Sequence, residues 1–129
     1  MSAPSTAVVE RDLGRLEGLW ADGLSESYRS YLDAVADHPQ DRQEKLALAA
    51  ALVEVGLRLQ GLGEHAAPPA RLLMGDLCLA RSSRILTDAA SRAVQIAFAR
   101  AVEELSGAAA AHQAAPSVRD LLVKALRAK

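Results

Sequence analysis

The 129-residue sequence has little of the material that builds β-sheets. It contains one Phe, one Trp and two Tyr, so aromatic residues make up only 3% of the chain. Half of the residues are hydrophobic, and most of these are Ala and Leu, which favour helix over strand. The composition therefore predicts an all-α fold, and the length suits a single domain over residues 1–129.

Cysteine is almost absent. The single Cys78 excludes an internal disulfide framework, which fits a reducing compartment. Cys78 lies among apolar residues of an expected helix, where a thiol is usually a small, inert core group with a raised pKa. We therefore expect it to be structural rather than a nucleophile.

No charge of one sign dominates, because 15 basic residues stand against 16 acidic ones and the formal net charge is -1. Nothing thus indicates attraction to nucleic acid or to an anionic membrane surface. The first residues lack the basic start and apolar run of a secretory signal. The most apolar window, 46–62, is interrupted by Glu54, Arg58 and Gln60, so we expect no membrane span and a cytoplasmic protein.

Hydrophobic periodicity and punctuation by Pro, Gly and Ser predict a compact bundle of about five to six helices. The first, capped by Ser5 or Thr6, runs to Gly23, and a second starts at Ser25 or Ser27 and may continue the first as one kinked helix. The others are expected from Pro39 to Leu62, from about 70 to 89, from 88 or 91 to Gly107 or 111, and from 117 to 128. Asp37 or His38 is the expected cap of the third helix.

The third helix is expected to be the most enclosed. Between Leu46 and Leu62 apolar residues lie on nearly every helical face, which is typical of a helix surrounded by others. Its narrow polar stripe contains Glu54 and Arg58, one turn apart in the favourable order with the acid first.

Metal-binding chemistry is not indicated. His38, His65 and His112 are far apart, and none forms a pair with another His or Cys at helical spacing. His38 and His112 are expected to be exposed residues at helix ends. Glu64 and His65 are adjacent on a turn, where neighbouring side chains usually point apart, so a solvated loop pair is the simplest interpretation.

Two groups of large side chains allow more than one role. Arg81, Arg84 and Arg92 could face a diphosphate, since guanidinium groups match phosphate oxygens in pairs, but such residues more often cover helix edges or bridge to a partner's acids. Trp20, Tyr28 and Tyr31 are expected to be core or interface anchors rather than part of a cofactor site.

Three stretches in order carry a resemblance. Residues 49–65 resemble the helix of trans-prenyl diphosphate synthases that reads A-A-x-x-E-L-I-H-x-x-S-L-I-H-D-D, with Glu54 at the helix glutamate and Glu64 and His65 at the first two aspartates. Residues 72–81 look like the family's L-A-G-D-x-L-L-A-x-A helix, and 101–107 like the helix ending in E-L-x-x-G-Q. The similar region covers about residues 46–112.

The departures from the family are informative. Family enzymes are longer and use the aspartates of D-D-x-x-D, with a second Asp-rich helix opposite, to hold Mg²⁺ on the allylic diphosphate. Here the first motif reads Glu-His-Ala-Ala-Pro, and no second Asp-rich helix follows. Because diphosphate departure requires several carboxylates around magnesium, we expect this chain to be no enzyme by itself and to hold no metal or cofactor.

The resemblance implies a small, non-catalytic subunit of a heterodimeric trans-prenyl diphosphate synthase. Its partner would be a catalytic large subunit that holds Mg²⁺, in a complex making quinone side chains. In the family, dimerisation uses the Gly-Asp helix and the helix after it. The corresponding interface residues are Leu73, Leu77, Ala80, Arg81, Arg84, Val94, Phe98 and Val102.

Two alternatives stay open. The main rival is a self-associating helical adaptor with no link to isoprenoids, because Ala-Leu-rich amphipathic helices mimic one another easily. A homodimer of this chain alone would favour it. The other alternative is a stand-alone enzyme that uses Glu64 and His65, although no third group is expected to orient them.

Overall fold

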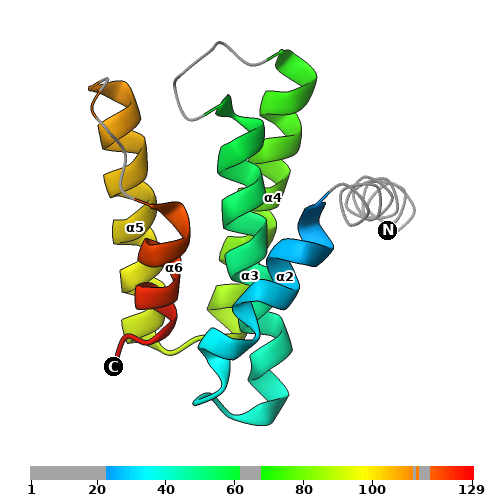
Figure 1. The fold of residues 1–129 in the computed structure, drawn as a ribbon, viewed down its shortest axis with the longest axis vertical. Coiled ribbons are helices and arrows are strands. Elements are labelled where there is room, and N and C mark those ends of the chain that lie inside the picture. The colour runs from blue at the N-terminus through cyan, green and yellow to red at the C-terminus, as the bar shows by residue number, and fades with distance from the viewer. Residues whose placement is uncertain (1–22, 62–67, 112, 114–116) are drawn as a thin grey trace, which may run out of the picture.

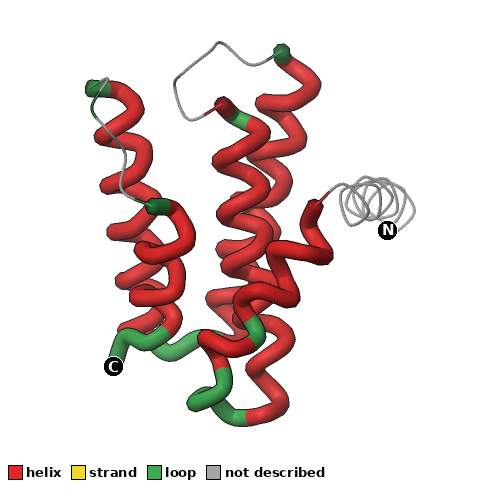
Figure 2. The backbone as a smooth tube through the Cα atoms, in the orientation of Figure 1, coloured by secondary structure: helices red, strands yellow, loops and turns green. Residues whose placement is uncertain are grey.

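The computed structural model describes residues 23–61, 68–111, 113 and 117–129. Within these residues the chain is helical and contains no strand, which confirms the predicted all-α class (Figures 1 and 2). The elements are α2 (Ser25–Tyr31), the 3-10 helix η2 (Asp33–Val35), α3 (Gln40–Leu59), α4 (Pro69–Ala89), α5 (Arg92–Ala110) and α6 (Val118–Leu126). The expected first helix with Trp20, the Glu64–His65 pair and His112 lie outside the described residues.

Proline and serine residues lie at the starts of α4, α5 and α6. Pro69 occupies the first turn of α4, where its missing N–H has no intrahelical partner in any case. Ser91 caps α5 by accepting a hydrogen bond from the Val94 N–H at 3.2 Å, and Ser117 caps α6 through the Asp120 N–H at 3.3 Å. Helix α5 continues past Gly107 to Ala110, one of the two ends that the sequence allowed.

The start of α3 differs from the prediction. Pro39 itself is the N-cap and has no side-chain cap hydrogen bond, so neither Asp37 nor His38 caps the helix. Proline fixes its own φ and disfavours helical geometry in the preceding residue, which places the boundary one residue later than expected. Asp41 lies in the first turn, where a negative charge is favourable next to the helix dipole.

Helix α3 is the centre of the described structure. It contacts α2, α4 and α6, and α4 returns beside it in the opposite direction (Figure 1). Residues 46–57 of α3 are all buried except the half-buried Leu48. The prediction that this is the most enclosed helix is confirmed. Helices α5 and α6 form a second antiparallel pair, and α6 contacts both α5 and α3.

His38 is not the exposed helix-end residue that the sequence indicated. It is half-buried, and its Nε2 lies 2.6 Å from the Leu126 carbonyl oxygen, to which an N–H at this position donates. Leu126 is the last residue of α6. The imidazole therefore connects the corner before α3 to the C-terminal end of α6, an arrangement set by tertiary packing over 88 residues.

Candidate functional site

Helix α4 packs on α3 through one stripe of buried residues. Its buried positions are Gly75, Cys78, Ser82, Leu86 and Ala89, which recur every three or four residues and so share one helical face. The Ser82 hydroxyl donates a hydrogen bond to an α3 carbonyl oxygen at 3.0 Å. All other α4 residues are half-buried or exposed. In the described structure α4 is therefore an edge helix.

The two helices approach closely where Gly56 and Gly75 meet. A Cβ atom at Gly75 would lie 2.8 Å from the Gly56 carbonyl oxygen and 2.6 Å from Gln60 Cγ. One turn later on α3, Gln60 Nε2 donates a hydrogen bond to Asp76 Oδ1 at 2.7 Å. The Gly-Asp pair of α4 thus serves the contact between α3 and α4, with glycine providing the space and aspartate a polar link at its edge.

The opposite side of α4 carries apolar side chains that are open to solvent. Leu73 is 52% exposed and Leu72 is 41% exposed, while Leu77 is half-buried and Ala80 and Arg84 are exposed. Leu73, Leu77, Ala80 and Arg84 recur at helical spacing and form one row, which we call the outer α4 face. All four belong to the predicted interface.

The α5 members of the predicted interface lie elsewhere. Val94 and Phe98 are buried in the core of this chain, and Val102 is half-buried. Phe98 and Val102 line a groove of about 400 Å³ between α4 and α5, which we call the α4–α5 groove. Its α4 wall is formed by Leu79, Ser82, Ser83, Leu86 and Thr87, not by the outer α4 face. The structure therefore divides the predicted residues between two surfaces and the core.

The three arginines that the sequence indicated as a possible diphosphate site lie on two helices. Arg81 is half-buried and Arg84 exposed on α4, whereas Arg92 is exposed in the first turn of α5. None of the three forms an ion pair with another residue that the structure describes. Guanidinium groups at the edge of an apolar face suit pairing with a partner's carboxylates.

A buried polar cluster centres on Glu54 of α3, which is only 8% exposed. The Ser27 hydroxyl donates to Glu54 Oε1 at 2.7 Å, and the Tyr31 hydroxyl donates to Oε2 at 2.9 Å. Arg119 Nη2 of α6 donates to Oε1 at 3.3 Å, and Arg58 Nη2 lies 3.7 Å from the same oxygen. One carboxylate therefore joins α2, α3 and α6.

The electrostatics of this cluster are self-consistent. Burial, the charge of Glu54 and the hydrogen bond to it raise the pKa of Tyr31, so its hydroxyl stays protonated and remains a donor. The Arg119 guanidinium also lies 4.9 Å from the centre of the Tyr31 ring, a cation–π geometry. A buried carboxylate with two hydroxyl donors and two cations is fully partnered, which is characteristic of a structural group.

Sequence reasoning placed Glu54 and Arg58 in a polar stripe and missed the burial of Glu54. Its partners Ser27 and Tyr31 are one turn apart on α2. This spacing places both hydroxyls on the same side of the helix, and it is the signal in the sequence that could have indicated a common hydrogen-bond acceptor on another helix. Tyr31 is fully buried, whereas Tyr28 is half-buried. Of the two predicted roles, core or interface anchor, Tyr31 has the core role.

Cys78 and the possible metal ligands offer little chemistry. Burial raises the pKa of the Cys78 thiol to about 11, as expected for a core thiol in an apolar helix face. Among the described residues, no three His, Cys, Asp or Glu side chains form a group that could hold a metal ion. Across the same residues, no helix combines the length and hydropathy needed to cross a membrane.

Comparison with protein-family models, with curated proteins and with solved structures finds no match to this chain.

Proposed function

We propose that this protein is a non-catalytic small subunit of a heterodimeric trans-prenyl diphosphate synthase, and that its outer α4 face binds the catalytic large subunit. The observation that carries this proposal is the outer α4 face on an edge helix, where the large apolar side chain of Leu73 is 52% exposed. The resemblance of residues 72–81 to the family's dimerisation helix gives the partner. Helix α4 thus has one face for its own fold and one face for another chain.

The area needed by a stable complex extends the contact beyond this row. Burying a leucine completely contributes about 1.5–3 kcal/mol, so Leu72 and Leu73, which are already partly buried, supply only about 2 kcal/mol together. Standard interfaces bury about 800 Å² on each partner. We therefore expect the large subunit to cover the α4–α5 groove as well, including Val102, while Arg81 and Arg84 pair with its carboxylates.

In the proposed complex the large subunit is catalytic and the small subunit is regulatory. The large subunit holds Mg²⁺ and carries out chain elongation, because that chemistry needs a carboxylate cluster. The small subunit stabilises it and closes the distal end of its elongation cavity, which limits product length. The product is a medium or long all-trans prenyl diphosphate for quinone side chains.

The test is co-expression with the large prenyl diphosphate synthase chain of the same genome, followed by assays of each chain alone and of the mixture. We expect co-purification, no turnover by this chain alone, and higher activity or altered product length in the mixture. Full activity and unchanged product length of the large chain alone would overturn the proposal, as would turnover by the isolated small chain. A homodimer that ignores every synthase would identify the adaptor instead.

A pair of variants localises the contact. Leu73→Arg places a charge on the outer α4 face without disturbing the core, since Leu73 is more than half exposed. Burying an unpaired charge in the seam should reduce association by at least about a hundredfold. Ser106→Arg is the matched control, because Ser106 is exposed on α5 and lines neither surface. Equal association of both variants with the large chain would place the interface elsewhere.

A further inference from the structure

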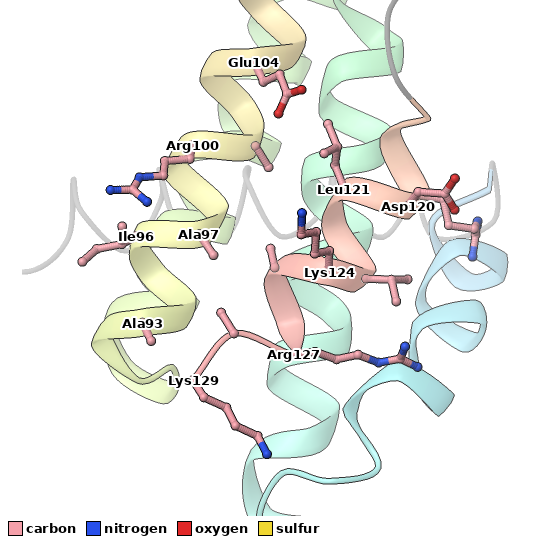
Figure 3. Close-up of a pocket in the computed structure, with 15 residues that line it drawn as sticks. Ala93, Ile96, Ala97, Arg100, Glu104, Asp120, Leu121, Lys124, Arg127 and Lys129 are labelled. Atoms are coloured by element: carbon pink, nitrogen blue, oxygen red, sulfur yellow. The ribbon is translucent and has the colours of Figure 1, made fainter.

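Helices α5 and α6 form the walls of a second and larger hollow, which we call the α5–α6 groove. Its volume is about 1030 Å³, and no residue of α4 lines it (Figure 3). The apolar part of its lining includes Ile96, Ala97, Ala101, Leu121 and Ala125. Ile96 is 43% exposed although it is a large aliphatic residue. Ala101 and Ala125 are buried, so the apolar surface that the described helices leave partly uncovered consists of Ile96, Ala97 and Leu121.

The lining carries more basic than acidic side chains. Arg100, Lys124, Arg127 and Lys129 line the groove without an ion pair to any described residue, against the two acids Glu104 and Asp120, whereas Arg119 also lines it but is paired with Glu54. The whole chain has a formal net charge of -1, so this excess is local and does not reflect the overall composition. A surface of one sign attracts a partner of the opposite sign and sets its orientation.

The cations are spread around the groove rather than directed at one point. In Figure 3 the Arg100 side chain points away from α6, Arg127 points away from α5, and Lys129 lies at the end of the groove. A compact anion such as a diphosphate is bound by cations that converge on it. The spread instead fits an extended partner whose negative charges are distributed along its length.

Shape and size indicate the same kind of partner. Pockets for small molecules have volumes of about 300–1,000 Å³ and bury most of their ligand. The volume of this groove lies at the upper end of that range, and the groove is open between two helices, so it would leave much of a small ligand exposed. Helix α5 has 19 residues and is therefore about 28 Å long at 1.5 Å per residue. An amphipathic helix laid into such a groove places its apolar stripe on the floor and its polar flanks at the rim.

We propose that the α5–α6 groove binds an acidic amphipathic helix of a partner protein. The apolar stripe of that helix covers Ile96, Ala97 and Leu121, and its flanking carboxylates pair with Arg100, Lys124 and Arg127. This site goes beyond the proposed function, because it uses no residue of the outer α4 face. Either proposal can fail while the other stands.

The experiment uses the full chain and a fluorescein-labelled synthetic helix of about 18 residues, with Leu at i, i+3, i+4 and i+7 and Glu on both flanks. Fluorescence anisotropy should show at least tenfold tighter binding of this peptide than of the same peptide with Lys in place of Glu. Raising the ionic strength from about 0.05 to about 0.5 M should weaken binding, because exposed charges are screened. Amide chemical-shift changes in NMR spectra should map to α5 and α6.

Three variants test the site itself. The double variant Arg100→Glu/Lys124→Glu and the single variant Ile96→Asp should each lower affinity at least about tenfold, while the helical circular dichroism signal stays unchanged. Arg42→Glu is the matched control, since Arg42 is an exposed cation on α3 outside the groove. Equal binding of the acidic and basic peptides, or shift changes confined to α4, would overturn the proposal. So would binding of dodecyl phosphate in the groove without binding of the peptide, which would identify an anionic amphiphile as the ligand.

Discussion

Helices α3 and α4 have nearly the same length, 20 and 21 residues, but opposite roles. Eleven residues of α3 are buried, against five of α4. The α3 segment from Ala47 to Ala51 is rich in alanine, whose small side chains allow neighbours to approach from several sides. Helix α4 carries larger side chains around its circumference and contacts α3 along one stripe. Fold stability therefore resides mainly in α3, whereas α4 has surface left for binding.

The largest effect should come from removing the carboxylate at the centre of α3. Glu54→Leu leaves the buried Ser27 and Tyr31 hydroxyls without their acceptor and Arg119 without its counter-ion. Because each unsatisfied buried group costs about 1–3 kcal/mol, we expect the free energy of unfolding to fall by about 3 kcal/mol. Urea unfolding followed by circular dichroism measures this change.

Two further variants sharpen the interpretation of Glu54. Glu103→Leu removes an exposed carboxylate from α5 and should change the free energy of unfolding by less than about 0.5 kcal/mol. The triple variant Ser27→Ala/Tyr31→Phe/Glu54→Leu removes the donors together with the acceptor, and should recover most of the lost stability. If Glu54→Leu alone were as stable as the wild type, the cluster would not hold α2 and α6 on α3.

Local signals in the sequence predicted most of the helices. Proline and serine act on the backbone within a few residues, so Pro69 and Ser117 indicated the starts of α4 and α6 to within about one residue, and Ser91 was one of the two starts that the sequence allowed for α5. The same applies to the enclosed position of α3, which follows from apolar residues on all its faces. These features need no knowledge of distant contacts.

Features that depend on distant contacts were not predictable in the same way. Glu54 meets Ser27 and Arg119, which are 27 and 65 residues away, and periodicity within one helix contains no information about such pairs. Likewise, the family resemblance assigned Val94 and Phe98 to an interface, whereas packing within this chain buries both residues in its own core. The predicted interface residues of α4 are therefore at least partly exposed, whereas those of α5 lie mostly in the core, and the interface itself stays a prediction.

An intermediate effect on the free energy of unfolding should come from Cys78, a buried residue of α4, when the pH is raised. The ordinary pKa of the Cys78 thiol is 9.0, and burial raises it to about 11. Between these values the unfolded chain releases a proton that the folded chain keeps, so the free energy of unfolding falls as pH rises from 9 to about 11. The expected loss is about 2 kcal/mol.

Urea midpoints at pH 8 and pH 11 measure this loss, with Cys78→Ala as the matched variant. Tyr31 contributes a loss of the same sign in both proteins, because its pKa is also raised by burial. The difference between the two proteins isolates the thiol. A variant whose stability falls as steeply as that of the wild type would show that Cys78 does not titrate as a core group.

The smallest effect should appear at the closest approach of the two helices. In Gly75→Ala the new methyl group would lie 2.8 Å from the Gly56 carbonyl oxygen, a backbone atom that cannot rotate away. Alanine in a helix contributes up to about 1 kcal/mol relative to glycine, but overpacking costs about 1–3 kcal/mol, so we expect a net loss of about 1 kcal/mol. Gly107→Ala in α5 meets no atom within 4 Å and should stabilise the protein by about 0.5–1 kcal/mol. Thermal unfolding of both variants measures the two signs, and stabilisation by Gly75→Ala would mean that α4 is free to move away from α3 even along its buried stripe.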